Sequence, residues 1–209
     1  IKLSTFNNIN GYAVTSEAYT SVTVANSTFS GNDGIYIVNA TATIENNTFT
    51  GTKYGVYVFN TTNPVSIKNN IFDSTNSYGV FLEESTGVTI SDNTFVETYL
   101  FIDGSKVEAF NSHTITSDNI VNGSSLYYIV DQDNPAIPSG GGEYILANCT
   151  NIIIKDMNIT SMLFPYEIAF SNFTITNVTV TNNVYGFYVT RLYDGAKIEE
   201  SLFMEERVY

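Results

Sequence analysis

Four short stretches align without gaps: VTVANSTF (22–29), TIENNTF (43–49), VSIKNNIF (65–72) and VTISDNTF (88–95). They recur every 20 to 23 residues. A fixed period of this length is typical of solenoids, in which each repeat is one turn of the chain. The same register extends through the rest of the sequence.

The register gives two columns of apolar residues. The first column is Phe6, Phe29, Phe49, Phe72, Phe95, Val121, Ile159, Val180 and Phe203. The second, five positions earlier, is Ile1, Val24, Ile44, Ile67, Ile90, Ile154, Ile175 and Ile198, and Thr116 interrupts it. Because side chains alternate between the two faces of a strand, each coil has one apolar face that points inward.

A further short apolar run follows the first one in several coils. These runs are GIYIV (34–38), YGVYV (54–58), YGVFL (78–82), YLFI (99–102) and YGFYV (185–189). Helical spacing is absent, and short apolar runs bounded by Asn, Gly, Ser and Thr indicate strands and turns. One coil cannot bury its own apolar face, so coils must stack. The sequence predicts an all-β fold, a parallel β-helix of about nine coils forming a single domain over residues 1–209.

Polar residues also form a column, three positions before the large apolar residue. Its members are Asn26, Asn46, Asn69, Asp92, Asp118, Asp156, Asn177 and Glu200. Asn and Asp tolerate a left-handed backbone, so the column predicts a ladder of sharp turns whose side chains are tucked against neighbouring coils.

Nine N-x-S/T sequons occur in the chain, and they favour an exported protein, although Asn and Thr are also common in turns and strands. Asn26, Asn46 and Asn177 belong to the ladder and are expected to be inaccessible. The candidate glycosylation sites lie in other turns and are Asn39, Asn60, Asn122, Asn148 and Asn172.

One insertion breaks the period, with the sequence DQDNPAIPSGGGE at 131–143. Two prolines and three consecutive glycines exclude a regular strand, so the segment is expected to leave the solenoid wall as a loop. Asp131, Asp133 and Asn134 offer the oxygen ligands that calcium prefers. Apart from this weak calcium site, no cofactor is expected.

Charge limits the classes of partner. Eight Lys plus Arg against 21 Asp plus Glu give a net charge of −13, which repels nucleic acid. No apolar stretch is long enough to span a membrane. The single cysteine, Cys149, is expected to pack in the core.

The coil pattern resembles the right-handed parallel β-helix repeat family, which includes pectate lyases and the NosD-like copper-processing proteins. The most specific stretch is GSSLYYIVDQDNPAIPSGGGEYILANCTNIIIKDMNIT (123–160), which is most similar to the NosD-like group and to repeat-rich surface proteins of archaea. The resemblance implies a right-handed β-helix in an exported protein, located extracellularly or at the cell surface. It implies no activity, because the aspartate clusters and the His and R-x-K motifs of the sugar-cleaving members do not occur.

Three further kinds of site have candidate residues in the sequence. Sugar contact would use outward tyrosines, and Tyr57, Tyr127 and Tyr188 alternate with inward residues. Glycoside hydrolysis would need a carboxylate pair, such as Glu83 with Glu108 or Asp131 with Asp133. Copper would need soft or imidazole ligands, but His113 is expected to be solvated, and the methionines 157, 162 and 204 share no short spacing.

These observations favour a non-catalytic structural or adhesive surface protein. The alternative is a carbohydrate-binding module or a polysaccharide lyase or hydrolase of the same fold. Ile1 already occupies the inward column and Tyr209 follows soon after Phe203, so no cap is visible at either end. Self-association into a filament or lattice, or membership of a longer exported protein, is therefore expected.

Overall fold

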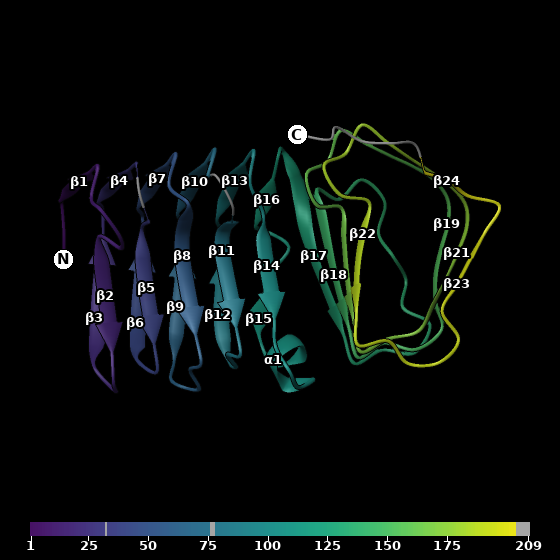
Figure 1. The fold of residues 1–209 in the computed structure, drawn as a ribbon, viewed down its shortest axis with the longest axis horizontal. Helices are drawn as coiled ribbons and strands as arrows, with labels where there is room; N and C mark the ends of the chain where they lie inside the picture. The colour runs from purple at the N-terminus through teal and green to yellow at the C-terminus, as the bar shows by residue number, and fades with distance from the viewer. Residues whose placement is uncertain (32, 76–77, 204–209) are drawn as a thin grey trace. The chain divides into compact units, whose positions relative to one another are not determined.

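The computed structural model describes residues 1–31, 33–75 and 78–203. The chain divides into two compact units, Ile1–Gly123 and Ser124–Tyr209, here called the first and the second unit. Nearly all regular structure in both units is parallel β-strand (Figure 1). The predicted parallel β-helix is thus confirmed, whereas a single domain over 1–209 stays a prediction.

The first unit is built from three parallel sheets, and successive coils each add a strand to a sheet. Sheet 1 contains β1 (Thr5–Asn7), β4 (Thr28–Ser30), β7 (Thr48–Thr50), β10 (Ile71–Asp73), β13 (Thr94–Val96) and β16 (Ile120–Val121). Sheet 2 contains β2 (Val14–Glu17), β5 (Ile35–Val38), β8 (Tyr54–Phe59), β11 (Tyr78–Glu83) and β14 (Leu100–Asp103). Sheet 3 contains β3 (Ser21–Ala25), β6 (Thr41–Glu45), β9 (Val65–Lys68), β12 (Val88–Ser91) and β15 (Thr114–Ile115).

A ladder of phenylalanines fills the core behind sheet 1. The register pairs Phe6, Phe29, Phe49, Phe72 and Phe95 in order, followed by Val121. Neighbouring rings stack with centroids 4.7 to 5.0 Å apart, which matches the distance between adjacent strands. The column predicted from the repeat is confirmed in this unit.

The aliphatic column lies on sheet 3. Val24, Ile44, Ile67 and Ile90 pair in register and are fully buried. The next member is Ile115, which pairs with Ile90, so Thr116 does not interrupt the column. The step from Ile115 to Val121 is one residue longer than the equivalent step in the earlier coils. Counting five positions back from Val121 therefore gives Thr116 instead of Ile115.

A buried polar ladder runs one position after the predicted turn column. Ser27 donates its backbone N–H to Asn47 Oδ1 at 2.9 Å, and the same bond repeats along the coils. The later donor and acceptor pairs are Asn47 to Asn70, Asn70 to Asn93 and Asn93 to Asn119, at 2.9 to 3.1 Å. Each asparagine Nδ2 also donates to a backbone carbonyl of the preceding coil.

The turn column itself is left-handed, as predicted, but its side chains are exposed. Asn26, Asn46, Asn69 and Asp92 have φ between 52° and 56°. All four are exposed, whereas the residue that follows each of them is buried. The expectation that the column is tucked between coils is wrong, because the left-handed residue turns its own side chain outward and directs the next one inward.

Glycines of sheet 2 make room for the phenylalanine ladder. A Cβ on Gly55 would lie 2.4 Å from Phe72 Cδ1 and 2.5 Å from the carbonyl oxygen of Gly79. The recurring Y-G-V sequence therefore reflects a close approach between the backbone and the ring of the next coil.

One short helix, α1 (Glu108–Asn111), departs from the all-strand pattern. It buries Ala109 and Phe110 and precedes β15. Four residues are too few for an amphipathic period to be visible in the sequence.

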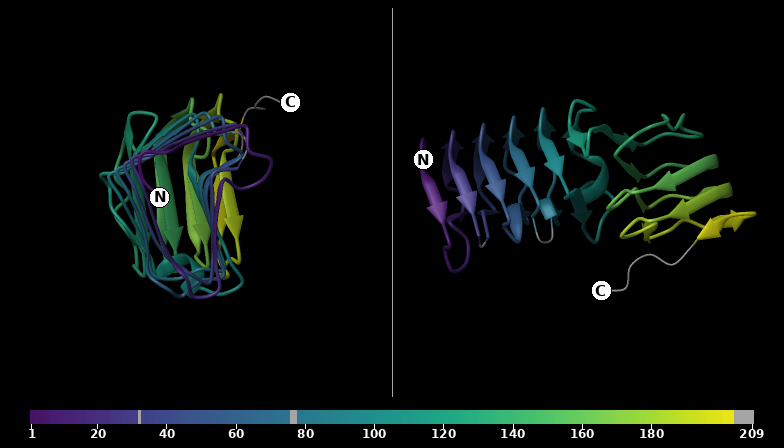
Figure 2. Two further views of the ribbon diagram at one scale, coloured as in Figure 1. Left: turned by 90° about the vertical axis from the view of Figure 1, so that its left-hand side faces the viewer. Right: turned by 90° about the horizontal axis from the view of Figure 1, so that it is seen from above.

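The second unit has two parallel sheets within Ser124–Tyr209. One contains β17 (Ser124–Val130), β18 (Glu143–Ala147), β20 (Tyr166–Ala169) and β22 (Phe187–Thr190). The other contains β19 (Ile152–Thr160), β21 (Phe173–Thr181), β23 (Lys197–Glu199) and β24 (Leu202–Phe203). The predicted pairs Ile154 with Ile175 and Ile159 with Val180 are confirmed. Views along other axes show the parallel course of these strands (Figure 2).

Candidate functional site

The outer face of sheet 2 carries a cluster of aromatic side chains. One row is set by strand register and consists of Tyr36, Tyr57, Phe81 and Phe101. A second row precedes these strands or opens them and consists of Tyr12, Tyr54 and Tyr78. We call these seven residues the aromatic face.

The rings of the aromatic face pack on one another along the coils. Tyr36 and Tyr57 have ring centroids 5.0 Å apart, and Tyr57 and Phe81 are 4.9 Å apart with planes 15° from parallel. Tyr12 stacks on Tyr36 at 4.9 Å. Because neighbouring rings cover each other's faces, this surface presents mainly ring edges and hydroxyls to solvent. Such edges suit polar contacts better than the stacking of a sugar ring.

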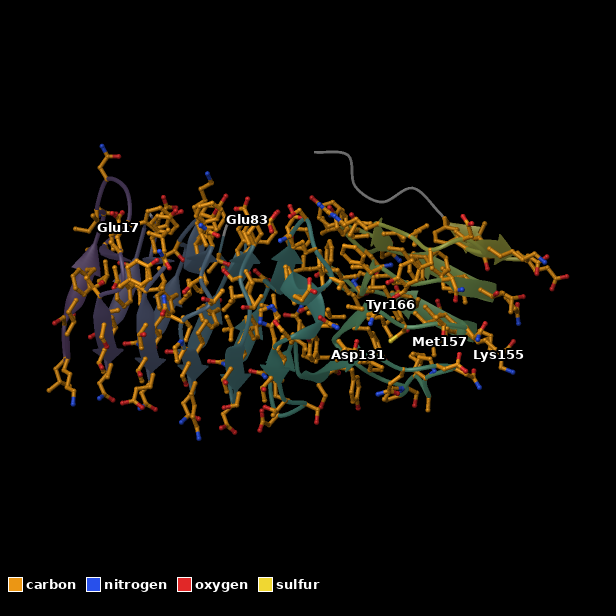
Figure 3. The ribbon with its side chains drawn as sticks, turned by 90° about the horizontal axis from the view of Figure 1, so that it is seen from below. Glu17, Glu83, Asp131, Lys155, Met157 and Tyr166 are labelled. Carbon is orange, nitrogen blue, oxygen red and sulfur yellow. The ribbon has the colours of Figure 1, made fainter. Side chains whose placement is uncertain are left out.

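Carboxylates border the aromatic face. Glu17, Glu83 and Asp103 occupy equivalent positions at the ends of their strands, and Glu17 and Glu83 lie along the same side of the first unit (Figure 3). Tyr57 Oη donates a hydrogen bond to Glu83 Oε2. Burial, followed by this bond, raises the pKa of Tyr57, so its hydroxyl stays protonated at any physiological pH.

The carboxylates proposed as a catalytic pair have local roles in the structure. Glu83 accepts the Tyr57 hydroxyl, and its neighbour Glu84 accepts hydrogen bonds from Ser105 N and Oγ at 2.8 and 3.1 Å. Glu108 opens α1. Glu83 is therefore positioned by its hydrogen bond with Tyr57, and not as one of two free acids that face the same cleft.

The three tyrosines predicted to form one outward stripe lie in different settings. Tyr57 belongs to the aromatic face. Tyr127 stacks on Tyr144 at 5.5 Å and packs against the core of the second unit, so the prediction that it points outward is wrong. Tyr188 lies between Phe187 and Val189, which pack against that core, and its ring centroid is 5.9 Å from that of Phe164. Sugar contact by Tyr127 and Tyr188 stays a prediction.

The loop of residues 131–142 is held at its start by the acids that were candidates for calcium. Asp131 Oδ1 accepts from Asn148 Nδ2 at 2.7 Å. Asp133 Oδ1 accepts from Thr150 Oγ1 at 2.7 Å and from Asn151 Nδ2 at 2.6 Å, and these bonds lower its pKa. Asn134 donates its backbone N–H to the carbonyl of Thr150. These contacts give the acids a structural role, and calcium binding stays a prediction.

The imidazole and the soft ligands fall in different units, since His113 belongs to the first unit, whereas Cys149, Met157 and Met162 belong to the second. Cys149 is fully buried, as predicted. His113 is buried as well, so the expectation of a solvated imidazole is wrong. Met204 lies outside the described residues. Within residues 1–31, 33–75 and 78–203, no group of three or more His, Cys, Asp or Glu side chains is placed to hold a metal ion.

The predicted glycosylation sites are accessible to different degrees. Asn60 and Asn122 are exposed, whereas Asn39, Asn148 and Asn172 are half-buried. Asn148 is further engaged, since its Nδ2 donates to Asp131 and its Oδ1 accepts from Tyr193 Oη at 2.9 Å. Asn26, Asn46 and Asn177 are exposed, which removes the structural reason for excluding them.

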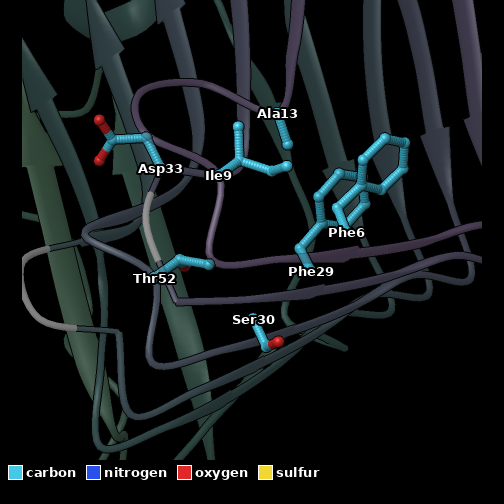
Figure 4. Close-up of a pocket in the computed structure, with 7 residues that line it drawn as sticks. All are labelled: Phe6, Ile9, Ala13, Phe29, Ser30, Asp33 and Thr52. Carbon is cyan, nitrogen blue, oxygen red and sulfur yellow. The ribbon is translucent and has the colours of Figure 1, made fainter.

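A hollow lies near the first coils of the first unit, between Phe6, Ile9, Phe29 and Thr52 (Figure 4). It is too small to hold a water molecule. It is therefore a packing irregularity and not a ligand site.

Comparison with protein families gives one match. The family described as the right-handed beta helix region matches residues 1–159. The chain belongs to this family. No curated protein and no solved structure matches the chain significantly. The handedness implied by the resemblance in the sequence thus agrees with the family, and the regular parallel pairing in both units is what a right-handed β-helix requires. Among the described residues, no helix has the length and hydrophobicity needed to cross a membrane.

Proposed function

We propose that this right-handed β-helix is a non-catalytic structural or adhesive module of an exported, cell-surface protein, related to the NosD-like group and archaeal surface repeats. The observation that carries the proposal is the repetition of the same contacts in successive coils. The asparagine ladder bonds each coil to the next through both backbone and side chain. Residues repeated in this way join each coil to its neighbours, so these side chains serve the scaffold.

The aromatic face supplies the adhesive element of this proposal. It combines tyrosine hydroxyls with the carboxylates Glu17 and Glu83 on one surface of the first unit. Hydroxyls and carboxylates bind polar surfaces through hydrogen bonds, and tyrosine adds contact area at a small entropic cost. Glycans on Asn60 and Asn122 would be compatible with the exposure of these two side chains.

The experiment that tests the non-catalytic role is incubation of the purified chain with polyuronates and with neutral polysaccharides, in the presence and absence of calcium. We expect no unsaturated products by ultraviolet absorbance and no new reducing ends. Release of either product, abolished by Glu83→Gln, would contradict the proposal.

A carbohydrate-binding module is the second candidate, because the tyrosine hydroxyls of the aromatic face can hydrogen-bond to sugar hydroxyls without ring stacking. Affinity electrophoresis in polysaccharide gels separates the two. Retardation that disappears in Tyr57→Ala but persists in Tyr188→Ala would place sugar binding on the aromatic face. Equal mobility of all three proteins in every gel would favour the structural role.

A further inference from the structure

A pocket lies in the second unit. Its cavity volume is about 280 Å³, close to the lower end of small-ligand sites. The loop residues 139–141 and residues of β19 line it. In the described chain β19 is the end strand of its sheet and pairs with β21 alone.

The floor of the pocket is apolar. Tyr144, Ile159 and Tyr166 line it and are 4%, 5% and 1% exposed. Both tyrosine hydroxyls already have partners. Tyr144 Oη donates to the carbonyl of Pro138 at 2.8 Å and accepts from Gly141 N at 2.7 Å, and Tyr166 Oη donates to Met157 Sδ at 3.5 Å. The floor thus offers few free hydrogen-bonding groups to a ligand.

The side walls add two thioethers. Met157 and Met162 line the pocket, and both pack against the core of the second unit (Figure 3 shows Met157 beside Tyr166). Thioethers adapt to an irregular apolar guest and make favourable contacts with aromatic rings. Tyr144 and Tyr166 stack on each other at 4.5 Å with planes 5° apart, so their ring edges are what remains for a guest. Ring edges attract the face of another aromatic ring.

Charge enters only at the rim. Asp156 lines the pocket, is exposed, and has φ of 55° in the left-handed turn of β19. Its Oδ1 accepts from Asn177 Nδ2 at 2.8 Å, which fixes the carboxylate while leaving it in contact with water. An ammonium group beside it would keep its hydration and gain an opposite charge, and the net charge of −13 attracts cations generally.

We propose that this pocket binds a small arylalkylamine, with the aromatic ring between Met157, Met162 and the tyrosine edges and the ammonium group beside Asp156. The apolar depth selects the ring, and the carboxylate at the rim selects the positive charge. An aromatic residue at the amino terminus of a peptide presents the same chemistry. This assignment is independent of the structural or adhesive role proposed above.

Methionine methyl NMR tests the proposal directly, because the chain has only three methionines. The full chain labelled with 13C at the methionine methyls is titrated with phenethylamine. We expect ring-current shifts of the Met157 and Met162 signals, assigned through Met157→Leu and Met162→Leu. Unshifted Met157 and Met162 signals at saturating amine would overturn the proposal.

The charge requirement is tested with ligands of matched shape. Phenylpropionate and 2-phenylethanol keep the ring and replace the ammonium by a carboxylate or a hydroxyl. We expect the carboxylate to bind at least tenfold more weakly than the amine, which is about 1.4 kcal/mol. Equal binding of all three would overturn the assignment of Asp156. A Phe-Gly amide competing as well as phenethylamine would assign the site to a peptide amino terminus, and weaker competition would assign it to free amines.

Asp156→Asn is the matched variant. Asn is the residue most used at this left-handed position, so the backbone and the bond from Asn177 are preserved while the charge is lost. We expect it to weaken amine binding about tenfold and to leave 2-phenylethanol unaffected. Asp92→Asn makes the same change at an equivalent left-handed position of the first unit and is expected to leave both ligands unaffected. A loss of amine binding in Asp92→Asn as large as in Asp156→Asn would show that the effect is general electrostatics.

Discussion

The buried asparagines explain how single residues join one coil to the next. Asn70 accepts a hydrogen bond from Asn47 N through its Oδ1 and donates its Nδ2 to the carbonyl of Ile44. Its own N–H is satisfied by Asn93 Oδ1. Each ladder asparagine therefore satisfies a buried N–H and a buried carbonyl of the preceding coil, which water cannot reach.

Replacing one rung should be costly. Asn70→Ala leaves the N–H of Asn47 and the carbonyl of Ile44 without these partners in a buried site, and we expect the free energy of unfolding to fall by about 2 to 4 kcal/mol. The control is Asn69→Gly, at the exposed left-handed neighbour, where glycine is conformationally permitted. Urea denaturation of both variants measures the difference. Equal loss in the two variants would show that the ladder contributes nothing specific.

His113 is held in the neutral state by its surroundings. Its Nδ1 accepts from Val88 N at 3.2 Å, so Nε2 carries the proton and donates to the carbonyl of Ala109 at 2.8 Å. Burial lowers the pKa of His113 from 6.5 to about 4, while the bond to Ala109 partly opposes the shift. Below pH 6.5 the unfolded chain binds a proton here that the folded chain does not bind.

Acid should therefore destabilise the fold through this residue. The stability that neutral His113 contributes is fully present above pH 6.5 and is lost as the pH falls toward 4. The loss reaches about 3 kcal/mol in the free energy of unfolding. The measurement is the free energy of unfolding from pH 8 to pH 4, compared with His113→Asn. Since this is the only histidine, the variant should lose less stability over that interval. Parallel pH profiles would contradict the role of His113.

At the scale of strands and turns, the sequence predicted the features that repeat from coil to coil and missed the features that do not repeat. The phenylalanine column and the paired aliphatic strands follow from spacing alone, because register and burial depend on the same period. The polar column predicted to pack between coils lies one residue before the buried polar ladder of the structure. Consecutive polar residues such as Asn46 and Asn47 have opposite orientations, and spacing does not show which one turns inward.

The remaining misses have local causes. Ile115 follows a one-residue change in coil length, and α1 is too short to show a period. Tyr127 was assigned outward by alternation with its neighbours, but the strand pairs it with Tyr144, which belongs to the core row. The pocket of the second unit was not predicted, because it combines the loop residues 139–141 with residues of β19 and β20. The sequence feature that pointed to this pocket was the insertion at 131–143.

The loop of residues 131–142 offers a test at this scale. Asp133→Ala removes the acceptor for Thr150 and Asn151, and we expect cleavage of the loop by a broad-specificity protease to accelerate several-fold at neutral pH. Because hydrogen bonds lower the pKa of Asp133, the wild-type loop should stay protected until the pH falls below the ordinary range for aspartate. Gln132→Ala, at an exposed residue of the same loop, is the control. Cleavage sites are mapped by mass spectrometry, and equal rates in the two variants would show that Asp133 does not anchor the loop.

For the molecule as a whole, exposed apolar residues and a large negative charge have opposite effects on association. Leu3 and Tyr19 in the first coil are 85% and 79% exposed, and Leu202 and Phe203 in β24 are 52% and 46% exposed. Such side chains beside strand edges favour the addition of further strands. The net charge of −13 opposes contact between copies, and salt screens this repulsion over a Debye length of about 10 Å at 0.1 M.

Self-association should therefore rise with ionic strength. We expect light scattering to give the monomer mass at about 10 mM salt and an increasing mean mass at about 0.5 M, with calcium acting at lower concentration than sodium. The control carries Leu3→Asn and Tyr19→Asn. Both positions have positive φ, which Asn tolerates, so the variant removes apolar surface without straining the backbone. It should stay monomeric in both salts, because screening alone provides no attraction. A wild-type chain that remains monodisperse in high salt and calcium, or a variant that associates equally well, would exclude end-to-end assembly through the first coil.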